Sequence, residues 1–308
     1  MLFKKRSKKE FSLLPHIKTE VYGFNAGAGQ VLGWEITKLG IDQQWIKSQG
    51  EDVIIAVVDT GCDLNHSDIK NNLIDGKNFV DNNKSPQDDN GHGSHVCGTI
   101  AAENNGLGMV GVAPRAKIMP VKALGARGQG SLDSIVNGII WSADNGADFI
   151  TMSLGSPNQS NELLKAIEYA SSKKCIVFAA AGNSGENVDV MYPAKYKEVI
   201  STGAIDENFE RTKFSCAGES LDFLAPGHNI FSLAPNNGYA IMSGTSMSNP
   251  YVTGCAALLL AYNRRTRKYQ LNNIDDYLRV LSTMTIELKN PTYKQHKYQG
   301  YGIIKVNL

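Results

Sequence analysis

Three motifs at widely separated points of the chain place reactive side chains beside glycines. Asp59 follows the apolar run 53–58, His92 stands between two glycines, and Ser246 opens a strongly apolar segment. An Asp at the end of a buried strand can bind Mg²⁺, cap a helix or orient a histidine. A Ser at the start of a helix can cap that helix or lie beside backbone N–H groups that bind an oxyanion. Glycines on both sides of His92 indicate close backbone approach and favour a functional site.

Short apolar runs rich in β-branched residues alternate with amphipathic segments of helical length. Such runs are typical of strands covered on both faces, and the alternation predicts an α/β fold with a parallel sheet and helices outside it. Ligands of such sheets bind beyond the carboxyl ends of the strands, where Asp59 stands. Strands are expected at 53–58, 116–121, 149–152, 176–180 and 199–203, and helices at 132–143, 163–172, 251–262 and 274–281.

Composition excludes several classes of protein. The 308 residues hold 31 Lys+Arg and 30 Asp+Glu, and this balance gives no general reason to bind nucleic acid or anionic lipid. No run approaches the roughly 20 apolar residues of a membrane span, and Pro15, His16 and Lys18 interrupt any signal-like stretch. Five cysteines without a Cys-x-x-Cys pair indicate reduced thiols, so we expect a cytoplasmic protein without a membrane or nucleic-acid partner.

The three motifs together resemble those of the subtilisin-like serine proteases. The motifs read VVDTGCD, NGHGSHVCGTIA and GTSMSNP in the order Asp, His, Ser, and AAAGNSG lies between the second and the third. The similarity runs over residues 34–261 and is strongest to the intracellular subtilisins. It implies a three-layer subtilisin-like α/β fold, with a mostly parallel central sheet flanked by helices.

The resemblance also implies roles for four residues. His92 would take the proton of Ser246 and return it to the leaving amine, while Asp59 would hold the His92 tautomer. Asn183 would donate its side-chain amide to the oxyanion, together with the backbone N–H of Ser246. All four residue types are present, so the chain is expected to be a serine endopeptidase that acts through an acyl-enzyme. A catalytically silent binding protein and a maturation protease with one protein target are the alternatives.

A polypeptide substrate would bind as an added strand. Glycines at a strand edge let another chain approach, and main-chain pairing gives affinity with little demand on sequence. The resemblance implies two edges that pair with the substrate backbone, one with Gly128 and Gly130 and the other with Ser153, Leu154 and Gly155. It also implies an uncharged pocket for the residue before the scissile bond, lined by Ala180, Gly182 and Met191. Apolar residues are the expected preference, and Tyr192-Pro193 matches a cis peptide bond.

A calcium site is implied by a loop over residues 103–111. It matches without a gap the loop with which the family wraps Ca²⁺, and few formal charges with hard oxygen ligands suit this ion. An ordinary Gly/Asn-rich turn is the alternative. The expected ligands are Gln30, Asp68, Glu103, Asn105, Leu107 and Met109. A zinc cluster of His92, His95 and Cys97 is disfavoured, because the sequence has no second ligand pair at zinc spacing.

The chain is expected to divide into an N-terminal extension, 1–26, and a catalytic domain, 27–308. The segment Leu13-Leu14-Pro15-His16-Ile17 resembles the short inhibitory extension of the intracellular group. The hypothesis is that it lies across the cleft as a strand, with Pro15 spoiling the geometry for cleavage until a proteolytic cut releases it. His16 itself is expected to be a surface or packing residue, and the segment 263–308 a peripheral layer. A homodimer is left open.

Overall fold

The computed structural model describes residues 10–20 and 29–308. Residues 1–9 and 21–28, which include part of the predicted extension 1–26, lie outside the described residues. The five cysteine side chains all fall within the described part, where they are buried and free.

A nine-stranded sheet forms the centre of the molecule, in the order β14-β15-β11-β10-β9-β7-β3-β5-β4. All neighbouring strands are parallel except β14 and β15. The five predicted strands are β3, β5, β7, β9 and β10, and they are almost completely buried, as continuous apolar runs require. The strands are β3 (Ile54–Asp59), β4 (Lys77–Asn78), β5 (Lys117–Lys122), β7 (Phe149–Met152), β9 (Ile176–Ala180), β10 (Val199–Ile205), β11 (Phe223–Pro226), β14 (Thr285–Ile286) and β15 (Ile303–Ile304).

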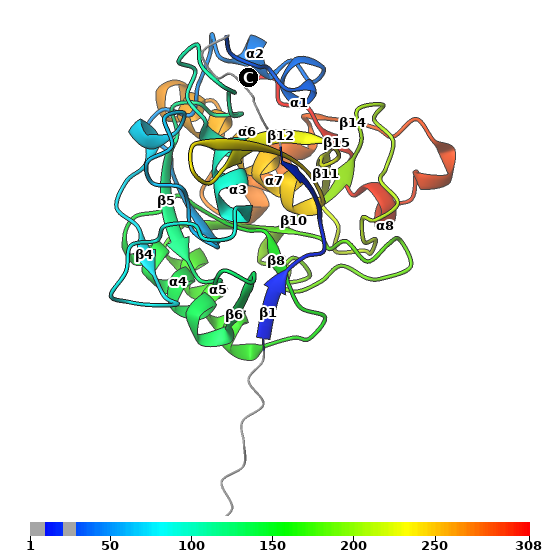
Figure 1. Ribbon diagram of the computed structural model, residues 1–308. Coiled ribbons are helices and arrows are strands. Elements are labelled where there is room, and N and C mark those ends of the chain that lie inside the picture. The colour runs from blue at the N-terminus through cyan, green and yellow to red at the C-terminus, as the bar shows by residue number, and fades with distance from the viewer. Residues whose placement is uncertain (1–9, 21–28) are drawn as a thin grey trace, which may run out of the picture.

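Two pairs of helices enclose the sheet and complete the expected three-layer α/β fold (Figure 1). One pair is α3 (His92–Ala101) with α6 (Thr245–Thr266), and the other is α4 (Leu132–Asp144) with α5 (Asn161–Ser172). Ser131 and Ser160 cap α4 and α5 by accepting hydrogen bonds from backbone N–H groups of the first turn. The remaining helices are α1 (Trp34–Thr37), α2 (Ile41–Gln44), α7 (Ile274–Ser282), α8 (His296–Gln299) and the 3₁₀ turns Lys70–Asn72 and Pro291–Tyr293.

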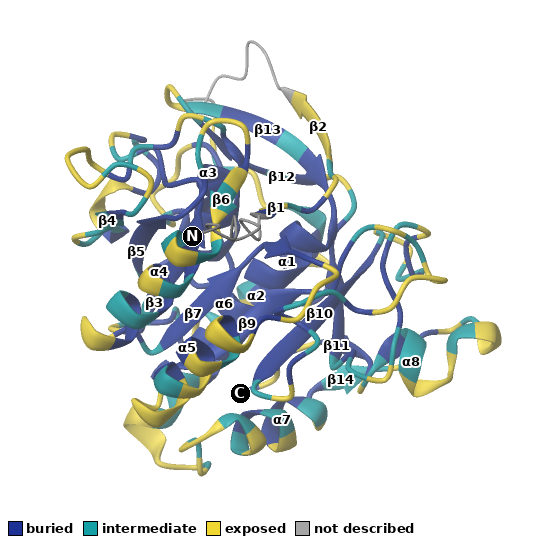
Figure 2. Ribbon diagram, turned by 90° about the horizontal axis from the view of Figure 1, so that it is seen from below, coloured by how far each residue is buried: buried dark blue, intermediate teal, exposed yellow. Residues whose placement is uncertain are grey.

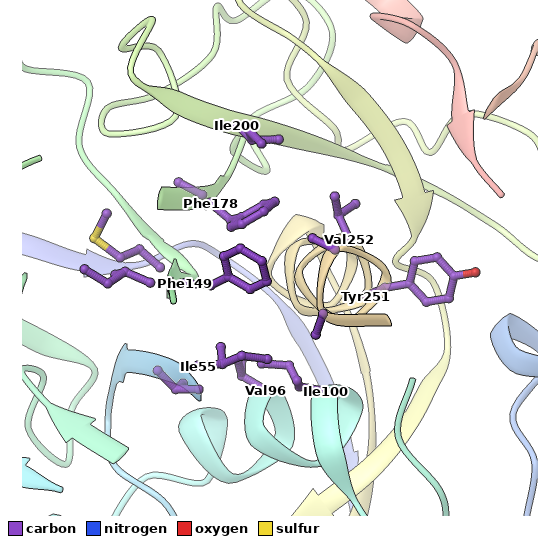
Figure 3. Packing of buried hydrophobic residues seen from close by; sticks show 14 of the residues in the cluster. Ile55, Val96, Ile100, Phe149, Phe178, Ile200, Tyr251 and Val252 are labelled. Atoms are coloured by element: carbon purple, nitrogen blue, oxygen red, sulfur yellow. The ribbon is translucent and has the colours of Figure 1, made fainter. Parts of the chain in front are cut away.

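The core between the sheet and the helices α3 and α6 fixes the two helices that contain the candidate residues His92 and Ser246. Figure 3 shows Val252 of α6 facing the aromatic rings of the sheet, while Tyr251 points to the other side of the same helix. Phe149 and Phe178, on neighbouring strands, meet edge to face with ring centroids 5.4 Å apart. Dense apolar contact on this side leaves α6 little freedom to shift, so its first turn is held rigidly.

The C-terminal segment differs from expectation. It was predicted to form a peripheral layer, but β15 pairs with β11 through Leu224 and Ile303 and extends the central sheet. Ile303 and Ile304 are buried, and pairing satisfies their backbone groups where water is excluded. The predicted helix at 274–281 is confirmed as α7.

Two small antiparallel sheets each include a strand of the N-terminal segment. β1 (Glu10–Leu13) lies between β6 (Gln129–Ser131) and β8 (Leu154–Gly155). β2 (Ile17–Glu20) lies beside β13 (Gly238–Ser243), which pairs on its other side with β12 (Ile230–Ala234). Residues 10–20 therefore cross the molecule as two strands joined by a short bend.

The order of the strands reverses at β3. The chain adds β5 and β4 on one side of β3, then returns to add β7, β9 and β10 on the other side. The crevice at such a reversal, beyond the carboxyl ends of the strands, is where open α/β sheets bind ligands. Asp59 is the last residue of β3 and so lies at this crevice.

Candidate active site

Asp59 and His92 form a buried hydrogen-bonded pair. Nδ1 of His92 lies 2.8 Å from Oδ1 of Asp59, and neither side chain is exposed. The same carboxylate oxygen accepts a 2.7 Å hydrogen bond from the backbone N–H of Thr60. Because an ionised carboxylate can only accept, Nδ1 carries a proton, which leaves Nε2 of a neutral ring free to take one.

Close backbone approach brings His92 to this position. His92 is the first residue of α3, and a Cβ atom added to Gly93 would lie 2.1 Å from the carbonyl oxygen of Gly61, so only glycine fits. The expectation from the flanking glycines is thereby confirmed.

Asp88 organises the same turn and was not singled out from the sequence. One of its oxygens accepts hydrogen bonds from the Thr60 hydroxyl and from the N–H of Gly91, while the other accepts from Ser94. Asp88 thereby ties the end of β3 to the start of α3. The signal available in the sequence was an Asp shortly before a glycine turn, where its side chain can bond the backbone.

Ser246 is the second residue of α6 and is fully buried. Its hydroxyl donates a 3.3 Å hydrogen bond to the carbonyl oxygen of Ser153, whose own hydroxyl donates to the carbonyl of Ser246 at 2.9 Å. Among the described residues, no group forms a hydrogen bond with Nε2 of His92. The expected bond between serine and histidine is thus not formed in this conformation, and the Ser246 hydroxyl must rotate away from Ser153 to make it.

Asn183 has its amide held in one orientation. Its Oδ1 accepts hydrogen bonds of 2.8 Å from both the backbone N–H and the hydroxyl of Thr245. Its Nδ2 is thereby turned outward and donates a 2.6 Å hydrogen bond to the carbonyl oxygen of Pro15. The donor predicted to bind an oxyanion therefore binds a peptide carbonyl of the chain itself.

The two predicted pairing edges are filled by β1. Phe11 pairs with Gly130, Ser12 pairs with Gly155, and Leu13 pairs with Leu154. The N–H of Leu13 also donates to the carbonyl oxygen of Gly128 at 2.9 Å. An antiparallel strand thus runs between these edges, as expected of a bound polypeptide.

Leu14 occupies the region of the predicted specificity pocket. It is 2% exposed, and a Cβ added to Gly155 would lie 2.7 Å from its side chain and 3.4 Å from Cβ of Met191. Met191 also borders Gly182, whose φ of +120° suits glycine. Ala180 is buried at the end of β9, and the Tyr192-Pro193 bond is cis, as expected.

His16, expected to be a surface or packing residue, is half-buried and packs against His92. Its ring lies 5.0 Å from that of His92, centroid to centroid, and its Nδ1 lies 3.1 Å from the carbonyl oxygen of Leu14. Burial, and next the nearby charge of His92, lower the pKa of His16. Nothing in the sequence indicated that the residue after Pro15 would pack against His92 in particular.

The predicted calcium ligands gather at one point. Nε2 of Gln30 lies 2.6 Å from the carbonyl oxygen of Glu103, 3.1 Å from that of Leu107 and 3.0 Å from that of Met109. Three carbonyl oxygens therefore converge on the side-chain amide nitrogen of Gln30. A flip of this amide would place Oε1 of Gln30 beside the same three carbonyl oxygens.

Asp68 adds a carboxylate to this group. Its Oδ2 accepts from the N–H of Met109 at 2.8 Å, whereas its Oδ1 is buried and has no partner among the described residues. Burial raises the pKa of Asp68, although neighbouring donors oppose the shift. Asn105 belongs to the same loop, where its Oδ1 accepts from the N–H of Leu107. A buried carboxylate oxygen beside convergent carbonyls is a donor set that suits a hard cation.

No three His, Cys, Asp or Glu side chains gather as a metal-binding group within residues 10–20 and 29–308. The candidate calcium site differs from such a cluster because most of its oxygens are backbone carbonyls. His95, one of the zinc candidates, contacts the carbonyl oxygen of Ile230 through Nε2 instead, and burial lowers its pKa to about 3. None of the described helices has the length and apolar character needed to cross a bilayer.

Comparison with known proteins places the chain in a family. Residues 50–302 match the model of the subtilase family. The chain is 40% identical to subtilisin DY of Bacillus licheniformis over 84% of its own length and 90% of that protein. It is 39% identical to the major intracellular serine protease of Bacillus subtilis over 78% of this chain and 78% of that protein. It is also 39% identical to the intracellular serine protease of Paenibacillus polymyxa, over 84% of this chain and 81% of that protein. The chain therefore belongs to the subtilase family and is a subtilisin-like serine protease.

Proposed function

We propose that this chain is a calcium-binding serine endopeptidase of the cytoplasm, made as a precursor that its own N-terminal segment restrains. Ser246 would be the nucleophile, His92 the base and Asp59 the residue that orients the base. Asn183 and the N–H of Ser246 would bind the oxyanion. The 2.8 Å bond between Asp59 and His92 and the outward-facing amide of Asn183 support these roles.

One observation carries the proposed restraint: residues 10–20 fill the cleft as a substrate would. Phe11 and Leu14 are 1% and 2% exposed, so both are fully buried in the region where substrate side chains are expected. The carbonyl held by Asn183 is that of Pro15, although Leu14 fills the pocket region. The pocket region and the oxyanion donor thus hold successive residues of the segment, whereas a substrate in position for cleavage would place the side chain and the carbonyl of one residue there.

Hydrolysis of a labelled peptide with Leu before the scissile bond tests the proposed function. The chain, once its N-terminal segment has been released, should cleave this peptide, and Ser246→Ala should abolish cleavage without changing the unfolding temperature. Digestion of unfolded casein separates the alternatives. Broad digestion supports a general endopeptidase, whereas cleavage of one native protein alone supports a dedicated maturation protease. Absence of cleavage of every substrate supports a silent binding protein.

Calcium would be held by Asp68, Gln30, the carbonyl oxygens of Glu103, Leu107 and Met109, and the Asn105 side chain. The orphan oxygen of Asp68 and the convergent carbonyls fit such an ion. Bound there, the ion supplies no step of peptide hydrolysis but joins the loop to the segment around Asp68. The intracellular relatives support cytoplasmic location. No feature of the described residues argues for the homodimer that the sequence left open.

A further inference from the structure

Lys122 is a buried cation at the carboxyl end of a central strand. It is the last residue of β5 and only 4% exposed, and Figure 2 shows the dark blue of this strand inside the sheet. In the register of the sheet it pairs with Asp59, the last residue of β3. Because an ammonium group loses its hydration on burial, the partners of Lys122 must offset that cost.

The first partner is the residue that follows Asp59. Nζ of Lys122 donates a 2.6 Å hydrogen bond to the carbonyl oxygen of Thr60. The backbone N–H of Thr60 donates to the Asp59 carboxylate, and the Thr60 hydroxyl accepts from the N–H of Gly93 in α3. Hydrogen bonds from a charged donor are stronger than those between neutral groups. Lys122 therefore restrains the backbone of Thr60, and with it the N–H that supports Asp59.

The second partner lies in the segment that leads to His92. Nζ of Lys122 is 2.5 Å from Oδ1 of Asp89, whose side chain is 52% exposed. Asp89 is followed by Asn90, whose Oδ1 accepts a 3.2 Å hydrogen bond from the N–H of His92. The ion pair thus ties this segment to the end of β5. Because the ammonium group is buried, water screens this pair less than it screens an ion pair at the surface.

Both links meet at a single nitrogen atom. One link leads through Thr60 to Asp59, and the other leads through Asp89 to the segment before His92. The 2.8 Å bond between Asp59 and His92 depends on where the end of β3 and the start of α3 lie relative to each other. Since a shift of about 1 Å between catalytic groups can lower a rate roughly a hundredfold, a group that joins these two segments affects the reaction from outside the pair.

We propose that Lys122 is a positioning residue: its ammonium group holds the strand end that carries Asp59 against the segment that leads to His92. The inference rests on the proposed function and adds to it a residue that touches neither the substrate nor the reacting atoms. Lys122 acts through Thr60 and Asp89, so its loss should slow the reaction without weakening the binding of substrate.

Lys122→Met tests this role, since Met keeps much of the apolar volume of the side chain but has no charge and no donor. The substitution is made in the chain opened by Phe11→Asp and Leu14→Asp, which place charges at two buried positions of the N-terminal segment. We expect kcat to fall at least about tenfold while KM for a short peptide changes by less than about twofold. Lys122→Arg keeps the charge and should give a kcat at least about threefold higher than Lys122→Met.

Lys117→Met is the matched control. Lys117 is the first residue of β5, at the end of the strand away from Asp59, and its Nζ donates a 2.9 Å hydrogen bond to the carbonyl oxygen of Asn71. The same substitution there should leave kcat and KM at the values of the opened chain. A kcat that Lys122→Met leaves unchanged, or a loss that Lys117→Met reproduces, would overturn the positioning role while leaving the protease assignment standing.

Proton NMR separates this inference from the proposed function. The Nδ1 proton of His92 is bonded to Asp59 and should resonate far downfield of the backbone amides, so it reports on the pair without any catalysis. In the full-length chain that carries Ser246→Ala, Lys122→Met should shift or broaden this signal and Lys117→Met should not. That result supports the positioning role even if no variant cleaves peptides, an outcome that contradicts the proposed function alone. An unchanged signal contradicts the positioning role alone.

Asp89→Asn decides the question if Lys122→Met does not fold. The Asp89 side chain is half-exposed, so its loss of charge should leave the fold intact. We expect kcat to fall by about two- to fivefold with KM unchanged, and the His92 signal to move as well. If kcat and the signal both stay at their reference values, Lys122 does not join the two segments and the inference fails.

Discussion

At the scale of single residues, the site depends on side chains whose orientation is fixed by neighbours. Thr245 fixes the orientation of the Asn183 amide. The backbone N–H of Thr60 donates a hydrogen bond to Asp59. Asp88 joins the turn before His92 to the end of β3. Ser246 is the exception, because its hydroxyl is bonded to Ser153 and must turn to reach His92. The proposed proton transfer to His92 therefore requires this hydroxyl to turn away from Ser153.

Replacement of Asn183 by Ala removes the proposed side-chain donor to the oxyanion. The expected result is a kcat lower by roughly 10²–10³, the range known for the corresponding donor of subtilisin itself, with a small change in KM. Steady-state kinetics on the opened chain check this, and Ser184→Ala serves as the neighbouring control. An equal loss in the control, or a change confined to KM, would contradict the role.

Glu35 gives a pH dependence of stability. It is 3% exposed, its Oε2 has no partner among the described residues, and burial raises its pKa from 4.5 to about 7. The neutral form is favoured in the folded state, so the carboxyl destabilises the fold increasingly as the pH rises from about 4.5 to 7 and fully above that.

Glu35→Gln should therefore raise the free energy of unfolding at pH 8, by on the order of 1–3 kcal/mol, and change it little at pH 4. Urea unfolding at the two pH values measures the difference, with the exposed Glu168→Gln as control. Equal effects at both pH values would show that Glu35 is not the titrating group.

At the scale of elements, the proposed restraint rests on β1 and β2. Phe11 of β1 and Leu14, the residue after β1, are buried, while Ser12 between them is exposed. Phe11→Asp with Leu14→Asp places two charges in apolar surroundings, which should release the segment. The initial rate of peptide hydrolysis by the freshly purified chain should rise at least about tenfold, since each anchor contributes more than 1.4 kcal/mol.

The matched control for this prediction is Ser12→Asp. It adds a charge on the same strand at an exposed position, so the initial rate should change little. Deletion of residues 1–25 should reproduce the activation. An initial rate that stays at the wild-type value in both the double variant and the deletion would refute the restraint.

Much of this organisation could be predicted from the sequence, for identifiable reasons. Strands buried on both faces leave continuous apolar runs, so β3, β5, β7, β9 and β10 were found, and the motif glycines marked the turn before α3. The short strands β11 and β15 were missed because their pairing is set by distant residues and not by local pattern. For the same reason the contact of His16 with His92 and the role of Asp88 were out of reach, since both depend on how distant segments meet.

At the scale of the whole molecule, the candidate calcium site joins segments far apart in the chain. Gln30, Asp68 and the loop 103–111 meet there, and an ion that binds only the folded state stabilises it by mass action, by about 2.7 kcal/mol at a hundredfold excess over Kd. Chelation should lower the unfolding temperature of the wild-type chain. Asp68→Asn should unfold at a lower temperature that chelator and added Ca²⁺ barely change. A wild-type unfolding temperature that does not respond to Ca²⁺ would contradict the site.

The convergence of Asp59, His92 and Ser246 into one proton-transfer system is tested most directly by covalent labelling with a fluorophosphonate. The chain opened by Phe11→Asp and Leu14→Asp is treated with the probe, and the modified peptide is located by mass spectrometry. We expect one adduct per chain, on Ser246, and labelling at least about a hundredfold slower in His92→Ala because the serine then lacks its base. Labelling at another residue, or an equal rate without the imidazole, would contradict it.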